Sequence, residues 1–367
     1  MMKKFQQILT LVLSLGFMAV FAVWLLLSPD AEESVTERRR LAKCPTLSLS
    51  SVENGSFMNG FEKYMLDQFP LRDGFRTLKA VVNAKVFMQK DNNGLYSVGE
   101  HLSKLDFPTD FDSIDRAAQR FRYVYDTYLR NTEIKTYLSV IPDKNVFTAS
   151  QNGYPDKDYR ALAERLVKGF PEAKYIDISG LLSADDFYYT DSHWRQERIL
   201  KVADEIADKM GAERIGQCEK HDAGVSFYGV YYGQAALPHA PERLFYLDNA
   251  VIRGLKVYNA EASSDIPVYD LSAAAGRDPY EMFLGGARSI IRITNPNAAK
   301  ERRLIVFRDS FGSSIAPLLA AGYSEITLVD IRYIAPSALG RLIDFTKADD
   351  ALFLYSASVI NNSETIK

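Results

Sequence analysis

The sequence has few cysteine and histidine residues and little excess charge. Among 367 residues there are two cysteines, Cys44 and Cys218, and four histidines. The cysteines lack the spacing of a metal site or a disulfide framework, and a single disulfide between them stays open. The net charge is −3 and no long basic run occurs, so the electrostatic footprint of a nucleic-acid-binding protein is missing. No coenzyme A-binding pattern, internal repeat or low-complexity tract is present, and the sequence predicts no cofactor.

Apolar residues are plentiful by contrast. They make up 47% of the chain, which is enough for a buried core in one large domain, with or without an appendage. Aromatic residues reach 12%, and they fit either core packing or a surface that stacks on sugars.

One long uncharged apolar run lies near the N-terminus, from Ile8 to Leu27. A helix needs about 20 such residues to cross the hydrocarbon core of a membrane. The apolar regions of signal peptides reach about 15 residues and end at a small-residue cleavage site. The stretch WLLLSPDAEES contains no such site, which favours a retained anchor over a cleaved signal. We therefore predict a transmembrane anchor within residues 1–28, with Trp24 at a membrane interface.

The charges that flank this run do not settle its orientation. Lys3 and Lys4 precede it, whereas three arginines and a lysine follow it within 38–43. Taken alone, the positive-inside rule would place the following segment in the cytoplasm.

The rest of the chain is predicted to be a polar stalk, residues 29–56, and one α/β domain, residues 57–367. Apolar spacing in 57–87 predicts helices interrupted at Pro70. Further on, short β-type runs alternate with helical patterns, which indicates a mainly parallel central sheet flanked by helices. The expected strands are 136–141, 173–179, 303–307, 325–332 and 350–356, and the expected helices are 158–170, 195–211, 312–323 and 335–345. The segment 212–302 breaks this rhythm and is predicted to be an insertion that bears on the site.

Ser310 is a candidate nucleophile because of its place in RLIVFRDSFGSS. It lies at a turn from a predicted strand to a predicted helix, and open α/β sheets bind ligands at the carboxyl ends of their strands. Such a turn exposes the hydroxyl and points helix amides at an oxyanion formed beside it. The Ser310 amide is therefore predicted to form part of an oxyanion hole.

The stretch FYYTDSHW offers a base and its partner. A serine hydroxyl needs a base to take its proton, and a histidine base needs a partner to fix its tautomer. In an extended loop, Asp191 and His193 would face the same way. The alternative is that Asp191, Ser192 and Ser310 merely cap helices. A metal site is less favoured, since no third ligand of clear spacing is present.

Together these motifs resemble those of a known group. YYTDSHW and FRDSFG are similar to motifs of the DHHW family and of the related alginate O-acetyltransferases of the SGNH-like superfamily. Further matches occur in the family's order: ERRRLAKCP, FEKYMLDQFPLRD, IPDKNVF, DPYEMFLGG and DIRY. The resemblance spans residues 36 to 358.

The resemblance implies an SGNH-like α/β fold in which the Asp–His motif precedes the Ser motif. Carried over by position, Asp191 is the acid, His193 the base and Ser310 the nucleophile. Ser192 stands where many members carry His or Thr. Ala287 stands where many members carry Asn, which puts full activity in doubt if that Asn helps form the oxyanion hole.

The resemblance also implies a function. Relatives of this kind acetylate exopolysaccharides outside the cytoplasmic membrane, with a multi-spanning membrane-bound O-acyltransferase as the partner that passes acetyl groups outward. We therefore expect the N-terminus in the cytoplasm, the body outside and a polysaccharide as acceptor. Two alternatives remain: a carbohydrate esterase that removes acetyl groups, and a non-catalytic polysaccharide-binding protein of the cell envelope.

Six further residues complete the predicted site. Gly286 is a candidate second oxyanion donor. The others are candidates for substrate contact or for support of the triad: Lys144, Tyr189, Arg308, Asp330 and Arg332. For Lys144 and Arg332 the alternative is a solvated charge, and for Asp330 it is a turn cap.

Overall fold

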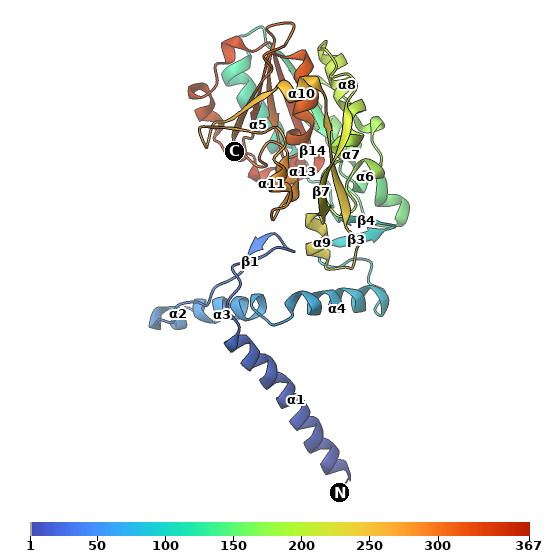
Figure 1. Ribbon diagram of the computed structural model, residues 1–367, viewed down its shortest axis with the longest axis vertical. Helices are drawn as coiled ribbons and strands as arrows, with labels where there is room; N and C mark the ends of the chain where they lie inside the picture. The colour runs from blue at the N-terminus through green and yellow to red at the C-terminus, as the bar shows by residue number, and fades with distance from the viewer. Residues whose placement is uncertain (1) are drawn as a thin grey trace. The chain divides into compact units, whose positions relative to one another are not determined.

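The computed structural model describes residues 2–367, without the side chain of Met2. The chain forms two compact units (Figure 1). The N-terminal unit contains the residues up to Asn93 together with Tyr232–Pro238, and the sheet unit contains Gly94–Tyr231 and His239–Lys367. This division falls after residue 93, whereas the sequence predicted a boundary after residue 56. Cys44 and Cys218 fall in different units, and both are free thiols.

The N-terminal unit begins with the long helix α1, Met2–Leu27, which includes the predicted apolar run. Within residues 2–367 it alone is long and apolar enough to cross a membrane. Its place near the N-terminus is typical of a signal sequence as well as of an anchor.

The predicted stalk is partly structured. It contains the short antiparallel pair β1, Glu33–Ser34, and β2, Arg39–Arg40, followed by helix α2, Leu49–Glu53. The helices α3, Ser56–Asp67, and α4, Arg72–Lys85, follow with a break at Pro70, as the sequence predicted.

The sheet unit is built on an eight-stranded sheet in the order β10-β9-β11-β13-β12-β14-β5-β6. The five strands from β13 to β6 run parallel, and the three on the other side pair antiparallel. A mainly parallel α/β sheet is therefore confirmed. Its strands are β5 Lys135–Ile141, β6 Lys174–Tyr175, β9 Lys256–Asn259, β10 Ser264–Ile266, β11 Ile290–Thr294, β12 Arg303–Arg308, β13 Glu325–Val329 and β14 Asp350–Ser356.

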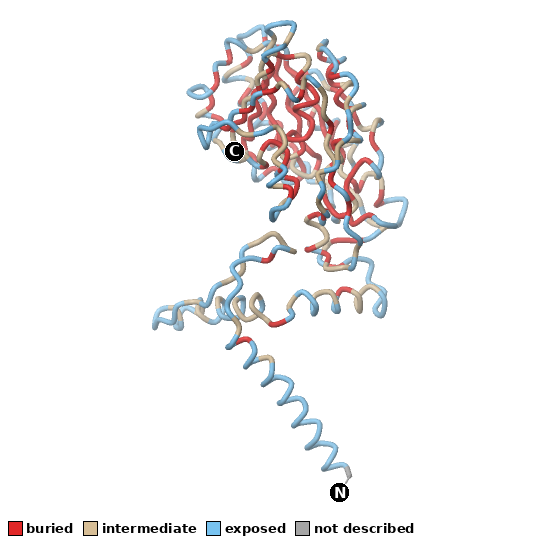
Figure 2. Tube along the Cα trace, viewed as in Figure 1, coloured by how far each residue is buried: buried red, intermediate tan, exposed pale blue. Residues whose placement is uncertain are grey.

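Both faces of the parallel strands are covered, which explains why these strands are continuous hydrophobic runs. Along β12, Leu304 and Val306 enter the core on one face, and Ile305 and Phe307 enter the core on the other. Figure 2 shows buried residues concentrated along these strands. The longer covering helices are α5 Phe111–Val124, continued by a π-turn Tyr125–Leu129, α7 Tyr159–Gly169 and α8 Leu200–Met210.

The segment 212–302 is more than an insertion. It contains the antiparallel hairpin β7, Glu219–Phe227, and β8, Glu242–Asp248, but it also supplies the three antiparallel strands of the central sheet. Sequence periodicity missed these strands because each has only three to five residues. The predicted helix 335–345 is also different, since it forms two 3-10 turns, Pro336–Arg341 and Phe345–Lys347.

The remaining elements are short. The strands β3 and β4 form a hairpin. These elements are β3 Leu95–Val98, β4 His101–Lys104, α6 Asn145–Thr148, α9 Val230–Ala235, α10 Ala250–Gly254, α11 Leu271–Ala274, α12 Gly312–Ile315 with a 3-10 continuation Ala316–Gly322, and α13 Ala357–Asn361.

Candidate active site

Ser310 lies at the carboxyl end of β12, in the turn that leads into α12. The preceding Asp309 fixes this turn: its Oδ1 accepts the Phe311 amide (3.0 Å) and its Oδ2 accepts the Ser356 amide (2.8 Å) at the end of neighbouring β14. Gly312 allows the tight return of the chain, because a Cβ there would lie 2.7 Å from the Cβ of Arg308. The nucleophile candidate is thus held by a central strand and its neighbour.

His193 connects Ser310 to Asp191. Its Nε2 lies 2.7 Å from the Ser310 Oγ, and its Nδ1 lies 2.6 Å from Oδ1 of Asp191. An Nδ1–H that donates to the carboxylate leaves the Nε2 lone pair free to accept the serine proton. Asp191 is fully buried, whereas His193 and Ser310 are partly exposed. The hydroxyl and the base are therefore accessible from outside.

The segment that begins at Gly229 docks on the Asp191 loop. The Val230 amide donates to Oδ2 of Asp191 (2.8 Å), the Gly229 amide donates to Oγ1 of Thr190 (2.8 Å), and the Tyr231 amide donates to the carbonyl of Thr190 (3.0 Å). A Cβ at position 229 would clash with Thr190 and Asp191. Glycine is therefore required for this approach, and the amide of Val230 then orients the carboxylate that orients His193.

Lys144 supports the same loop through its side-chain amine. Its Nζ donates to the carbonyls of Tyr188 (2.7 Å), Tyr189 (3.0 Å) and Asp191 (2.9 Å), and the side chain is buried. Burial lowers the pKa of Lys144 to about 7, and the charges of Glu242 and Asp191 oppose this shift. Lys144 is thus not a solvated charge in this structure. It holds the loop that carries the acid and the base.

Glu242, which sequence reasoning did not single out, holds the other side of this loop. Its Oε1 accepts the amide of Tyr189 (2.7 Å) and an Nη2–H of Arg195 (2.6 Å), and its Oε2 accepts the amide (2.8 Å) and hydroxyl (2.9 Å) of Thr190. It lies on β8, within the segment predicted as an insertion.

The His193 ring is fixed by aromatic neighbours. It stacks on Tyr280 with the ring centroids 3.9 Å apart, and Phe311 lies at 4.9 Å. The Tyr280 hydroxyl and the Trp194 indole N–H both contact Oγ of Ser314, each at 2.8 Å. Tyr280 belongs to the DPYEMFLGG stretch, one of the motifs that resemble the DHHW family. The motif pointed to this residue, but its contact with His193 could not be deduced from sequence alone.

The amides around Ser310 differ in their availability. Those of Phe311, Gly312 and Ser313 already donate within the turn, whereas the Ser310 amide donates no hydrogen bond within residues 2–367. This leaves it available to an oxyanion, and its role in an oxyanion hole stays a prediction. The Gly286 amide already donates to the carbonyl of Phe283 (3.2 Å), so its hydrogen bonding does not support a role as second donor.

The predicted residues Arg308, Asp330 and Arg332 form a charged cluster at the same edge of the sheet, in which Arg308 and Asp330 are buried and Arg332 is partly exposed. Arg332 donates to both carboxylate oxygens of Asp330 (2.9 and 2.7 Å), and Arg308 Nη1 lies 3.8 Å from the same carboxylate. Asp330 also accepts the Arg332 amide, as a turn cap would (3.1 Å). Burial lowers the pKa of Arg308, whose Nε and Nη2 lack hydrogen-bond partners within the described residues.

Tyr189 lies on the outer side of the relay loop. Its ring is 4.5 Å from the Arg195 guanidinium and 4.8 Å from the His101 ring, and it is partly exposed. Its predicted contact with substrate stays a prediction.

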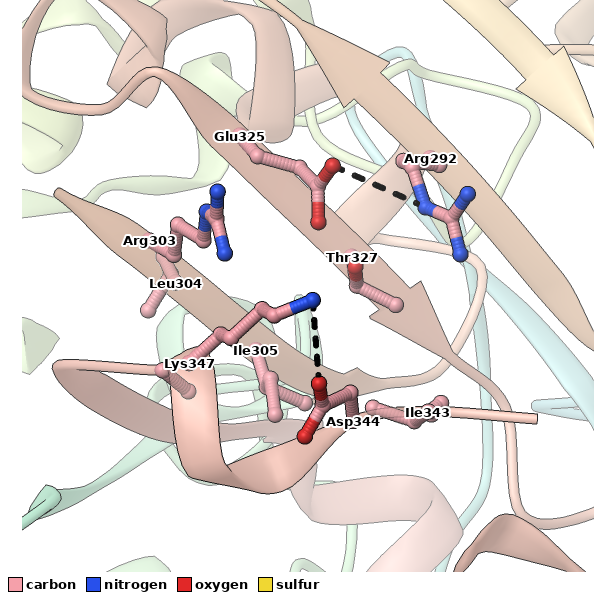
Figure 3. Close-up of a pocket in the computed structure, with 10 residues that line it drawn as sticks. Arg292, Arg303, Leu304, Ile305, Glu325, Thr327, Ile343, Asp344 and Lys347 are labelled. Atoms are coloured by element: carbon pink, nitrogen blue, oxygen red, sulfur yellow. Dashed lines mark ion pairs between the residues drawn. The ribbon is translucent and has the colours of Figure 1, made fainter. Parts of the chain in front are cut away.

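A separate cavity of about 220 Å³ lies away from the relay (Figure 3). It includes Arg303, the first residue of β12, whereas Ser310 follows the last. Most of its charged side chains form ion pairs with each other: Arg292 with Glu325 (3.7 Å) and Lys347 with Asp344 (3.1 Å). This cavity is therefore not part of the candidate active site.

Comparisons with known proteins agree with this geometry. Residues 183–329, which include Asp191, His193 and Ser310, match the family model described as DHHW protein. This region thus matches the DHHW family model, and the resemblance seen in the sequence is confirmed.

Solved structures share the fold. A DHHW family protein from Eubacterium siraeum has a TM-score of 0.60 at 18% identity, and the match covers 75% of this chain and 95% of that one. Bacillus cereus PatB1 with a sulfonyl adduct has a TM-score of 0.58 at 17% identity, covering 72% of this chain and 97% of that one. A second PatB1 structure gives the same TM-score and identity over 74% and 98% of the two chains. No curated protein matches the chain.

Proposed function

We propose that this protein is a membrane-anchored, extracytoplasmic O-acetyltransferase that acetylates hydroxyls of a cell-surface polysaccharide. The observation that carries the proposal is the continuous hydrogen-bonded series Asp191–His193–Ser310 at the carboxyl edge of the central sheet. Helix α1 supports the anchor, and the family resemblance supports the acetyl group and the polysaccharide.

The proposed reaction has two steps through an acyl-enzyme. His193 Nε2 takes the proton of Ser310 as its Oγ attacks the acetyl carbonyl, and the Ser310 amide stabilises the oxyanion. His193 returns the proton to the leaving group, and the acetyl ester of Ser310 remains. An acceptor hydroxyl then gives its proton to His193 and attacks this ester, after which the proton returns to Ser310. Throughout, Asp191 holds the ring and stabilises its positive charge.

The relay alone does not distinguish transfer from hydrolysis, because the two differ only in whether a sugar hydroxyl or water attacks the ester. The acetyl donor is proposed to come through the membrane from a membrane-bound O-acyltransferase, since acetyl-CoA is cytoplasmic. Because the relay fits both reactions, the esterase alternative is kept as an outcome of the test.

The test uses the full chain in detergent with p-nitrophenyl acetate. We expect a burst of p-nitrophenol equal to the enzyme concentration, an acetyl group on Ser310, slow turnover in water and faster turnover with an oligosaccharide acceptor. A sulfonyl fluoride should modify Ser310 and abolish the burst. Ser310→Ala should lower the rate at least about 10³-fold, because triad members act as a unit. Ser264→Ala, an exposed serine on β10, is the matched control and should keep the wild-type rate.

Two results would contradict the proposal. Wild-type rates in Ser310→Ala would refute the nucleophile. Fast hydrolysis that no acceptor improves would favour the esterase. The acceptor can be identified by comparing the acetyl content of surface polysaccharides in a deletion strain, which should fall, with that of the complemented strain.

A further inference from the structure

Helix α4 in the N-terminal unit exposes a continuous apolar stripe. Leu71, Phe75, Leu78, Val82 and Val86 follow one another at intervals of three and four residues, so they share one face of the helix. Four of them are 39–68% exposed, and Val82 is half-buried. An exposed run of large apolar side chains marks a surface that another apolar medium or molecule covers.

The other side of α4 is unusually polar for a face that packs inward. Arg76 donates to the carbonyl of Gly233 (2.8 Å) and pairs with Glu37 (3.1 Å), and Arg72 also pairs with Glu37. Ala80 is the one fully buried residue of the helix. Helix α4 therefore turns its charged side toward other residues of the N-terminal unit and exposes its apolar side, the reverse of a helix on a water-soluble surface.

The stripe is continuous with helix α1. Phe75 lies 5.6 Å from Phe21 of α1, and Phe69, before α4, lies 5.3 Å from Phe21 and 5.7 Å from Phe75 (ring centroids). Trp24, one turn after Phe21, completes the cluster at 6.2 Å. Tryptophan near the end of a membrane span is typical of the interface between hydrocarbon and headgroups. This cluster therefore fixes the start of the stripe at that interface.

Helix α3 contributes to the same kind of surface. Met58, Phe61 and Leu66 are exposed, and Figure 1 shows α3 and α4 following one another end to end. Lys79 and Lys85 are exposed and border the α4 stripe on its two sides, where their amines can reach lipid phosphates while their stems stay apolar.

We propose that α3 and α4 lie in the interface of the membrane that α1 spans, with the α4 stripe among the acyl chains. Lipid is the occupant that these contacts favour, because the stripe begins at the aromatic cluster of α1 and lysines border it. The inference rests on the proposed function only in taking α1 as a retained membrane helix. It implies that the chain is held to the membrane surface well beyond its anchor, through residue 86.

The test uses the full chain in vesicles of phosphatidylcholine and phosphatidylglycerol, with Cys44→Ser and Cys218→Ser as background. A polarity-sensitive fluorophore is attached at Leu78→Cys or, as a matched control on the opposite side of α4, at Asp73→Cys. We expect blue-shifted emission at position 78 and at least about threefold stronger quenching by doxyl lipids than at position 73. Iodide in the aqueous phase should quench the label at 73 and spare the label at 78.

Other outcomes have defined meanings. Equal iodide quenching at both positions would overturn the proposal. A label at 78 that neither quencher reaches would mean that protein, such as a second copy, covers the stripe, and lipid would be wrong. A third label, at Ser14→Cys in α1, tests the membrane anchor separately from the α4 stripe. If doxyl lipids do not quench this label, α1 is not a membrane helix and the proposed anchor is wrong. Acetyl transfer by the same samples reports independently on the relay.

Discussion

Gly229→Ala is expected to damage the active site by a steric route that leaves the three relay residues themselves unchanged. A Cβ at position 229 would lie 2.2 Å from the Thr190 carbonyl oxygen and 2.4 Å from the Cβ of Asp191, whereas ordinary contact begins near 3.4 Å. The 229–231 segment must therefore move by about 1 Å. Both contacts are in the loop that carries the acid, one on its backbone and one at the root of the catalytic carboxylate, so no flexible side-chain end can absorb the change.

The movement breaks or lengthens the hydrogen bond from the Val230 amide to Asp191, now 2.8 Å. Overpacking of this kind costs about 1–3 kcal/mol of stability. A misplacement of about 1 Å at a catalytic group can cost about 10²-fold in rate. We therefore expect the rate with p-nitrophenyl acetate to fall about 10²-fold while the domain still folds.

The assay compares rate and thermal midpoint of Gly229→Ala with those of Gly180→Ala, where a Cβ would meet nothing within 4 Å. The control should keep both values. If Gly229→Ala keeps the wild-type midpoint and a rate within twofold, then the close approach does not position Asp191, and the account of this contact is refuted.

Three further predictions concern the support of the relay. Asp191→Asn should leave the fold intact, as circular dichroism would show, and kinetics should show a rate about 10⁴-fold lower because His193 takes the wrong tautomer. A loss under tenfold would exclude this role of Asp191. Tyr280→Ala should destabilise the protein by about 3–5 kcal/mol, whereas Tyr280→Phe, which keeps the stacked ring and loses one hydrogen bond, should cost only about 1 kcal/mol in denaturant unfolding. Burial lowers the pKa of Lys144 to about 7, so above this pH the unfolded chain binds more protons there than the folded one. The stability of wild type relative to Lys144→Met should therefore rise from pH 7 to 9, by up to about 1.4 kcal/mol per pH unit, and a flat difference would contradict the lowered pKa.

The sequence predicted four of the five parallel strands well, because those strands are buried on both faces and form clear hydrophobic runs. The strand predicted at 173–179 is shorter, since β6 contains only Lys174 and Tyr175 and neither is buried. Strands 303–307 and 350–356 and the helix 158–170 agree with the structure to within one or two residues. The antiparallel strands β9 to β11 were missed, since strands of three to five residues carry little periodic signal.

The candidate site was also predicted only in part from the sequence. Asp191, His193 and Ser310 could be proposed from sequence because each motif is local and follows a strand or precedes a helix. Glu242 and Gly229 could not, since their contacts depend on where the β7–β8 region folds back on the Asp191 loop. Lys144 was identified as a candidate for substrate contact or for support of the triad, but its hydrogen bonds to three carbonyls depend on tertiary packing.

Asp191 and His193 are only two residues apart, whereas Ser310 is 117 residues beyond His193. Closing the short loop restricts the chain little, so the acid and the base are aligned by their own segment. The relay then contains a single long-range joint, the bond between Nε2 and Oγ. A shift of the sheet edge that moves Ser310 relative to His193 therefore changes this one distance, so the reactivity of Ser310 reports how closely the turn after β12 packs against the Asp191 loop.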